Sequence, residues 1–182
     1  MRFDAAVAKF SIMAGTKPKK GQGRHPLKAR KRRFVVVMDS SPEAQVSMKF
    51  AAARASHVNG GSLVIFHVVP PGEFQHWVAV QDRMQQESKK EAQDLLQSVA
   101  AFVEEEYGIE PEIVIREGNP KEELKIYMEK TRDLFALFLG AHPEGEPGPL
   151  VDYFSGPLCG SLKCPVVIVP GGMTIEQIDE MA

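Results

Sequence analysis

Several residues that can bind a small polar ligand stand directly after apolar runs of the sequence. The runs end at Met38, Val69, Arg116 and Leu139. The residues of interest in the loops that follow are Asp39, Ser40, Gly118, Gly140, His142, Gly145 and Gly148. His142 has a side chain suited to acid–base chemistry or to bonding a phosphate, although a loop histidine without chemistry is the plainer interpretation. Asp39 is either a ligand contact or a turn residue that bonds nearby amides.

The residue types of common metal and catalytic sites are scarce or scattered. The two cysteines, Cys159 and Cys164, are five positions apart with no histidine cluster near them, so we expect no metal site. Small buried core residues are the default interpretation of both, with a redox switch as the alternative. Since no nucleophile stands at a fixed spacing from a base, the sequence predicts a binding protein rather than an enzyme.

The apolar runs are typical of buried parallel strands. The expected strands are Phe34–Met38, Leu63–Val69, Glu112–Arg116, Leu134–Leu139 and Pro165–Val169. Helical patterns alternate with them, which predicts an α/β domain of three layers with a parallel sheet in the middle. In such sheets ligands bind beyond the carboxyl ends of the strands, so the polar loops should meet at one site. His67 lies inside a strand, and we expect it to be a packed, hydrogen-bonded core residue.

Capping residues and apolar periodicity mark the helices. Ser41 can cap a helix with Pro42 at its first position, and Thr174 with Gln177 has the spacing of a capping box for a short C-terminal helix. In the long helix expected over 81–107, the predicted core stripe is Met84, Ser88, Ala92, Leu95, Val99 and Phe102. The helix before the last strand is expected to contain Gly156, Pro157 and Gly160.

Charge divides the chain into a tail and a body. Residues 1–32 hold ten basic residues and one acid, and residues 33–182 hold twelve basic residues and twenty-three acids. The tail, in which Met13 is an alternative start, is rich in Gly, Pro, Lys and Arg from residue 14, so we expect it to be disordered. It can bind nucleic acid electrostatically or simply be solvated. The expected domain is 33–170, followed by a C-terminal tail at 171–182.

Composition also bears on where the protein works. No apolar run approaches the roughly 20 residues that a membrane helix needs. Two cysteines do not make a secreted disulfide scaffold. The sequence therefore predicts a cytoplasmic protein.

Five segments, in the right order, resemble the universal stress protein family. They are Val-Val-Val-Met-Asp39-Ser-Ser, Val-Ile-Phe-His67-Val68-Val69, Arg-Glu-Gly118-Asn-Pro120, Asp133-Leu-Phe-Ala-Leu-Phe-Leu-Gly140 and Cys164-Pro-Val-Val-Ile-Val-Pro170. The resemblance covers about residues 33–170. It implies a Rossmann-like, adenine-nucleotide α-hydrolase-like sheet of strand order 3-2-1-4-5 and a non-catalytic stress-response regulator, often dimeric. It also implies that Asp39 and Val68 contact a nucleotide.

Many members of that family bind ATP through a pattern of Gly, two residues, Gly, nine residues, Gly and then Ser or Thr. Gly140 fits the first position. The other positions hold Pro143, Tyr153 and Phe154. Gly145 and Gly148 offer an alternative cradle, whereas Glu144 and Glu146 would each repel a triphosphate by about 1 kcal/mol. ATP is thus a candidate ligand, but the sequence argues against the family's own mode of binding it.

The last strand is expected at an edge of the sheet. Val166–Val169 is apolar and has no Lys or internal Pro to protect it, which favours pairing with a second copy into a two-fold homodimer. The alternative is that residues 171–182 fold back over this edge.

Two other functions remain open from the sequence. One is a nucleotide-handling enzyme of a related α/β family, although the turn Asp39-Ser-Ser-Pro42 lacks the Ser-Gly-Gly-x-Asp-Ser and His-x-Gly-His motifs of such enzymes. The other is a nucleic-acid-associated protein that acts through the basic tail.

Overall fold

The computed structural model describes residues 31–70 and 78–182, without the side chains of residues 78–89 and 91. Its centre is a sheet of five parallel strands in the order β3-β2-β1-β4-β5. The strands are β1 (Arg32–Val37), β2 (Gly61–Val69), β3 (Glu112–Glu117), β4 (Leu134–Ala141) and β5 (Val166–Pro170). Val35 of β1 aligns with Val64 of β2 on one side and with Leu137 of β4 on the other. The predicted strand order is confirmed, including the parallel pairing of the first and fourth strands.

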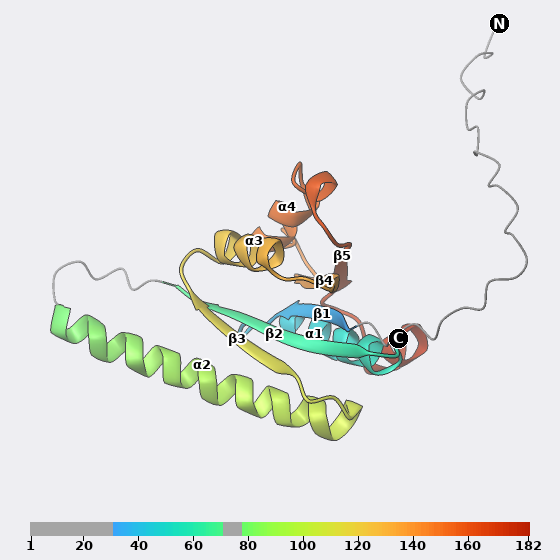
Figure 1. Ribbon diagram of the computed structural model, residues 1–182, viewed down its shortest axis with the longest axis horizontal. Helices are drawn as coiled ribbons and strands as arrows, with labels where there is room; N and C mark the ends of the chain where they lie inside the picture. Colours follow the sequence, from blue (N-terminus) through green and yellow to red (C-terminus); the bar gives the residue numbers. More distant parts are fainter. Residues whose placement is uncertain (1–30, 71–77) are drawn as a thin grey trace, which may run out of the picture.

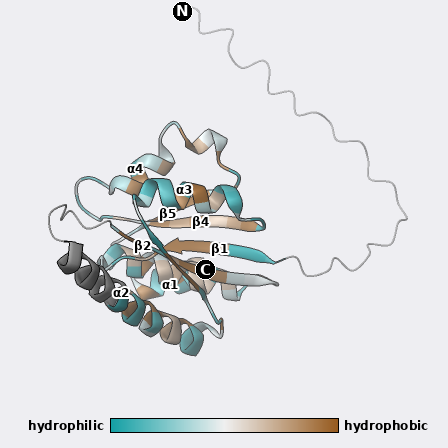
Figure 2. Cartoon of the chain, turned by 60° about the vertical axis from the view of Figure 1, so that its left-hand side comes forward, coloured by the Kyte–Doolittle hydropathy of each residue, from teal (hydrophilic) through white to brown (hydrophobic). Residues whose placement is uncertain are grey.

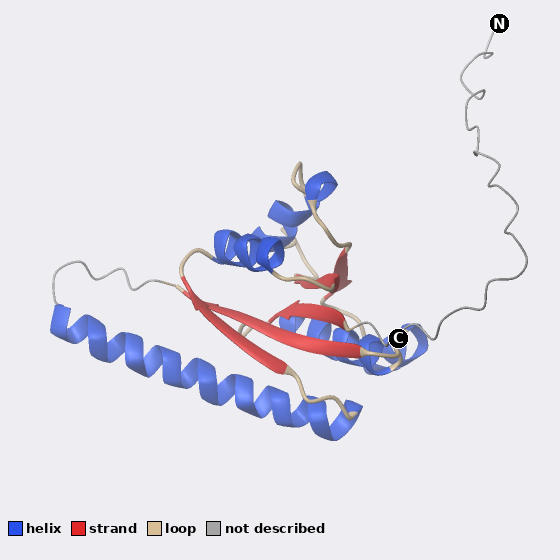
Figure 3. Ribbon diagram, in the orientation of Figure 1, coloured by secondary structure: helices blue, strands red, loops and turns tan. Residues whose placement is uncertain are grey.

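Helices cover both faces of the sheet, as the three-layer prediction requires (Figure 1, Figure 3). One face carries α1 (Pro42–Ser56), α2 (Val78–Tyr107) and α5 (Ile175–Met181), and the other carries α3 (Pro120–Lys130) and α4 (Pro149–Ser155). Within the described residues, no helix combines the length and the apolar character that crossing a bilayer requires.

The sheet has a hydrophobic core on each face. Along β1 the side chains alternate: Phe34 and Val36 pack towards α1 and α2, whereas Val35 packs towards α3 and α4. All three are at most 1% exposed, which contributes roughly 1.5–3 kcal/mol each. In Figure 2 β1 and β4 are largely brown, the colour of hydrophobic residues, while the start of β1 is teal. A strand of this kind is stable only when both faces are covered.

The predicted caps are present. The Ser41 hydroxyl accepts a hydrogen bond from Ala44 N at 3.3 Å. Thr174 and Gln177 form the full capping box at the start of α5. Because these caps satisfy amides that have no partner within the helix, they fix where α1 and α5 begin.

The face that α2 turns to the sheet differs from the predicted one. Leu96 and Val103 are fully buried, whereas Leu95 and Phe102 are 38% and 37% exposed. Ala92 is buried, as predicted. The predicted stripe was wrong at Leu95 and Phe102 because two neighbouring apolar stripes share the same seven-residue spacing, so periodicity alone cannot choose between them. The predicted core positions Met84 and Ser88 lie outside the described side chains.

The helix before β5 was also placed wrongly. α4 ends at Ser155, and Gly156 is the residue after it. Pro149 occupies the first helical position, where its missing N–H costs nothing, and Val151 and Phe154 bury one side of the helix. Gly156 and Pro157 therefore follow α4 instead of forming it. Gly160 is helical, as predicted, but it lies in a separate short 3-10 helix, η1 (Cys159–Ser161).

The C-terminal residues pack onto the domain. Ile178 of α5 is 2% exposed, and Arg54 of α1 donates a hydrogen bond to the Ala182 carbonyl oxygen at 2.8 Å. The predicted short helix is confirmed, and it lies against α1. Residues 1–30 lie outside the described residues, so the disorder and the nucleic-acid binding expected of them stay predictions.

Candidate functional site

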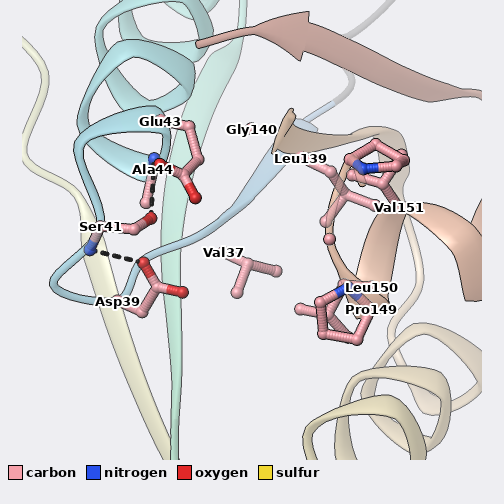
Figure 4. Close-up of a pocket in the computed structure, with 12 residues that line it drawn as sticks. Val37, Asp39, Ser41, Glu43, Ala44, Leu139, Gly140, Pro149, Leu150 and Val151 are labelled. Atoms are coloured by element: carbon pink, nitrogen blue, oxygen red, sulfur yellow. Dashed lines mark hydrogen bonds between the residues drawn. The ribbon is translucent and has the colours of Figure 1, made fainter. Parts of the chain in front are cut away.

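The carboxyl ends of β1, β2 and β4 border a hollow made of two adjoining cavities. The polar cavity, about 100 Å³, has Asp39, Ser41 and Glu43 on one side and Pro149, Leu150 and Val151 on the other (Figure 4). The apolar cavity, about 140 Å³, is lined chiefly by Phe66, His67, Val68, Leu124 and Leu150. The two cavities share Val37, Asp39, Pro149 and Leu150. The hollow therefore joins an apolar slot to a polar compartment, a common design of small-ligand sites.

The structure brings together four of the eight residues proposed as ligand contacts. Asp39 lines both cavities, Val68 lines the apolar one, and Gly140 and Gly148 line the polar one. The other four do not line either cavity: Ser40, Gly118, His142 and Gly145. The hollow thus lies at the expected end of the sheet, but it is lined by only some of the loop residues that were predicted to form it.

Asp39 makes the local bond expected of a turn residue. Its Oδ1 accepts a hydrogen bond from Ser41 N at 2.9 Å (Figure 4). That bond orients the carboxylate, which is exposed at the junction of the two cavities. An ionised carboxylate accepts several hydrogen bonds, so its turn role leaves capacity for a ligand hydroxyl.

Gly140 is required by the close approach of β4 to the start of α1. A methyl group added there would meet the carbonyl oxygen of Glu43 and lie 2.5 Å from its carbonyl carbon. Both atoms are backbone, which cannot move aside as a side-chain tip can. Gly140 therefore sets how closely β4 approaches the start of α1, which carries Glu43 of the polar cavity.

His67 is held in place by β1. Its Nδ1 lies 2.7 Å from the Met38 carbonyl oxygen, which can only accept, so Nδ1 carries a proton and donates it to this bond. The expected hydrogen bond is confirmed, but His67 is only half-buried and is not the core residue that was predicted. In addition, His67 lines the apolar cavity, a role that its position inside an apolar run did not indicate.

The loop between β4 and α4 is shaped by its own bonds. The exposed His142 ring places Nδ1 2.6 Å from the Glu144 carbonyl oxygen, and His142 N donates to the Pro147 carbonyl oxygen at 3.2 Å. Gly145 and Gly148 have φ values of 78° and 109°, which other residues adopt only with strain. These contacts give His142 and Gly145 a structural role in folding the loop back on itself.

The sequence did not indicate Glu43 as part of the site. Glu43 is in the first turn of α1, where an acid is explained by the helix dipole alone. In the structure it lines the polar cavity, and its Oε2 is buried without a hydrogen-bond partner in the described part of the protein. An acidic residue in the first turn of a helix that follows a ligand-binding strand end is the signal that would have found it.

The cysteines stand apart from the hollow. Cys164 is buried, and its burial raises the pKa of the thiol, but Cys159 is exposed, contrary to the expectation for two core residues. Across residues 31–70 and 78–182 no three His, Cys, Asp or Glu side chains come together as a metal site.

Comparisons with known proteins agree with the fold. The model of the universal stress protein family matches residues 31–170. A universal stress protein UspA from Lactobacillus plantarum is similar, with 19% identity, a TM-score of 0.64, and coverage of 78% of this chain and 99% of that one. One from Archaeoglobus fulgidus has 18% identity, a TM-score of 0.55, and coverage of 75% and 92%.

A third similar structure is a universal stress protein family protein from Arabidopsis thaliana with AMP bound. It has 15% identity and a TM-score of 0.50, and the match covers 80% of this chain and 94% of that one. No curated protein matches this chain. The family match spans the whole described sheet, and we conclude that the chain belongs to the universal stress protein family.

Proposed function

We propose that this protein is a regulatory module that binds the adenosine part of a ligand in the hollow at the carboxyl ends of β1, β2 and β4. The observation that carries the proposal is the junction of an apolar slot with a polar compartment at Asp39. Family membership supports it, as does the similar Arabidopsis protein that has AMP bound. The function is thus recognition of a nucleoside or nucleotide.

Each half of the hollow suits one half of adenosine. Val68, Leu124 and Leu150 offer the apolar contacts that a flat base needs. Asp39 is pre-oriented by Ser41 N, and its carboxylate can accept hydrogen bonds from the two ribose hydroxyls. We assign the base to the apolar cavity and the sugar to the junction.

The lining groups support a binding role without turnover. The Ser41 hydroxyl caps α1 through Ala44 N, and the His67 Nδ1 proton is engaged by the Met38 carbonyl oxygen. Both groups are therefore used to hold the walls of the hollow. A nucleophile and its base would instead be bonded to each other.

We further propose that two copies pair through β5. This strand lies at the end of the sheet order, and Ile168 at its centre is 42% exposed. An apolar edge strand readily adds a second strand, and pairing with its own copy gives a two-fold dimer. Native mass spectrometry should show a dimer, and Ile168→Lys should shift it towards monomer. A monomeric wild-type protein would contradict this part of the proposal.

Calorimetric titration with adenosine tests the ligand. Replacing Asp39 by Asn removes the charged acceptor, and hydrogen bonds to charged groups contribute about 1.5–3 kcal/mol, so we expect a loss of at least about tenfold in affinity. Asp94→Asn, at an exposed position of α2, is the matched control and should bind as the wild type does. Absence of adenosine binding to the wild type would contradict the proposal.

A further inference from the structure

The polar cavity carries negative charge where a nucleotide would place its phosphates. Asp39 and Glu43 both line it, on the wall opposite Pro149 and Val151 (Figure 4). Among the described residues that line this cavity there is no lysine or arginine. The buried Oε2 of Glu43 accepts no hydrogen bond in the described part of the protein. This acceptor is available to a ligand that brings a donor, and it is unfavourable to one that brings a phosphate.

The start of α1 has little capacity left to bind an anion. Ser41 N donates to Asp39 Oδ1, and Ala44 N donates to the Ser41 hydroxyl. Pro42, at the first helical position, has no N–H. Helix N-termini bind phosphates through free amides, and here most of those amides are absent or already bonded.

The loop on the other wall has lost several amide donors, although the start of α4 beside it has no side-chain cap over its first amides. Pro143, Pro147 and Pro149 lack amide hydrogens, and His142 N is bonded to the Pro147 carbonyl oxygen. The same loop carries the exposed acids Glu144 and Glu146. A glycine-rich phosphate cradle works by aiming several amides at the anion, and this loop replaces amides with prolines and adds negative charge.

We propose that the hollow selects adenosine-type ligands whose 5′ end is neutral or positively charged and disfavours AMP and ATP. This inference rests on the proposed function, since it concerns which ligands enter the same hollow. One carboxylate a few ångströms from one ligand charge, in a water-like dielectric, changes affinity by about fivefold. Two carboxylates against a multiply charged phosphate chain should weaken ATP binding by at least about tenfold relative to adenosine.

Four ligands titrated calorimetrically into the full chain separate charge from shape: adenosine, 5′-amino-5′-deoxyadenosine, AMP, and ATP with and without Mg²⁺. The amino compound differs from adenosine by one cationic group in place of a hydroxyl, and it should bind about fivefold more tightly. AMP and ATP should bind more weakly than adenosine. Added salt screens the charges, so it should reduce all these differences in affinity.

A matched pair of variants assigns the effect to Glu43. Glu43→Gln should raise AMP affinity about fivefold and reduce the advantage of the amino compound, leaving only the part that is due to Asp39. Glu176→Gln is the control, because Glu176 is exposed and holds the same second helical position in α5 that Glu43 holds in α1. The control should leave all affinities unchanged.

The possible outcomes distinguish the two proposals. If adenosine binds but ATP, with or without Mg²⁺, binds as tightly or more tightly, the charge selection is wrong and the adenosine site stands. If none of the ligands binds, both proposals are wrong. The wild-type series decides between these outcomes even if Glu43→Gln does not fold.

Discussion

Replacing Gly140 by Ala should destabilise the protein through one identifiable contact. The added methyl group would strike the Glu43 carbonyl group, 2.5 Å from its carbon, and would approach Ala44 N to 3.0 Å. Since the obstructing atoms are backbone of α1, the helix must move away from β4 or the strand must bend. Overpacking of this kind costs about 1–3 kcal/mol.

Thermal unfolding measures this cost. For a domain of this size, 2 kcal/mol corresponds to a fall in Tm of about 4–8 °C. Gly160→Ala is the control, because a methyl group there meets nothing within 4 Å, and it should change stability by no more than about 0.5 kcal/mol. If Gly140→Ala melted together with Gly160→Ala, the close approach of α1 to β4, and with it the shape of the polar cavity, would be refuted.

Three further predictions concern the core and its titrating groups. Leu96→Ala should cost about 2–5 kcal/mol in urea unfolding, whereas Leu95→Ala should cost less than about 1 kcal/mol, because only Leu96 faces the sheet; equal costs would contradict the observed face of α2. In the native protein Cys159 should react quickly with a thiol reagent and Cys164 slowly, because Cys164 is buried and its thiol pKa is raised. In urea both thiols should react quickly. Two fast thiols in the native protein would contradict the burial of Cys164. Burial, with the negative charge of Glu112, raises the pKa of Tyr127 in the folded protein. The protonated phenol therefore contributes stability below about pH 10, and this contribution is lost as the pH rises above that value. Urea unfolding of Tyr127→Phe should therefore show a smaller loss of stability at alkaline pH than the wild type, and identical pH profiles would contradict this.

The strands could be predicted because each has a single physical explanation. A short run such as Phe34–Met38, apolar on both faces, is stable only in the middle of a covered sheet, and β1 lies there. The turn chemistry of Ser41 and Pro42 was equally local, so the start of α1 followed from it. These predictions of β1 and of the start of α1 depend on short local stretches of sequence, and the structure confirms them.

The failures occurred where tertiary packing decided between equal local patterns. Leu95 and Leu96 each have another apolar residue seven positions later, Phe102 and Val103. Only the packing of α2 on the sheet decides that Leu96 is the buried one. Similarly, Pro149 can begin a helix or end a loop, and the burial of Phe154 decides for the helix. The spacing of residues in the sequence does not indicate which of these side chains becomes buried.

The hollow itself was half predictable. Asp39 and Gly140 follow strand ends, and parallel topology brings such residues to one edge of the sheet. Glu43 and Leu124 reach the hollow from helices, so their roles depend on where α1 and α3 pack. In the proposed site Glu43 sets the charge that faces the 5′ end of the ligand, so the strand ends alone did not indicate that charge.

A crystal structure of the protein grown with adenosine would show whether the hollow binds this ligand. We expect the base to lie between Val68 and Leu124 and the ribose hydroxyls to donate to the Asp39 carboxylate. Adenosine bound elsewhere on the surface, or an empty hollow at saturating ligand, would contradict this expectation.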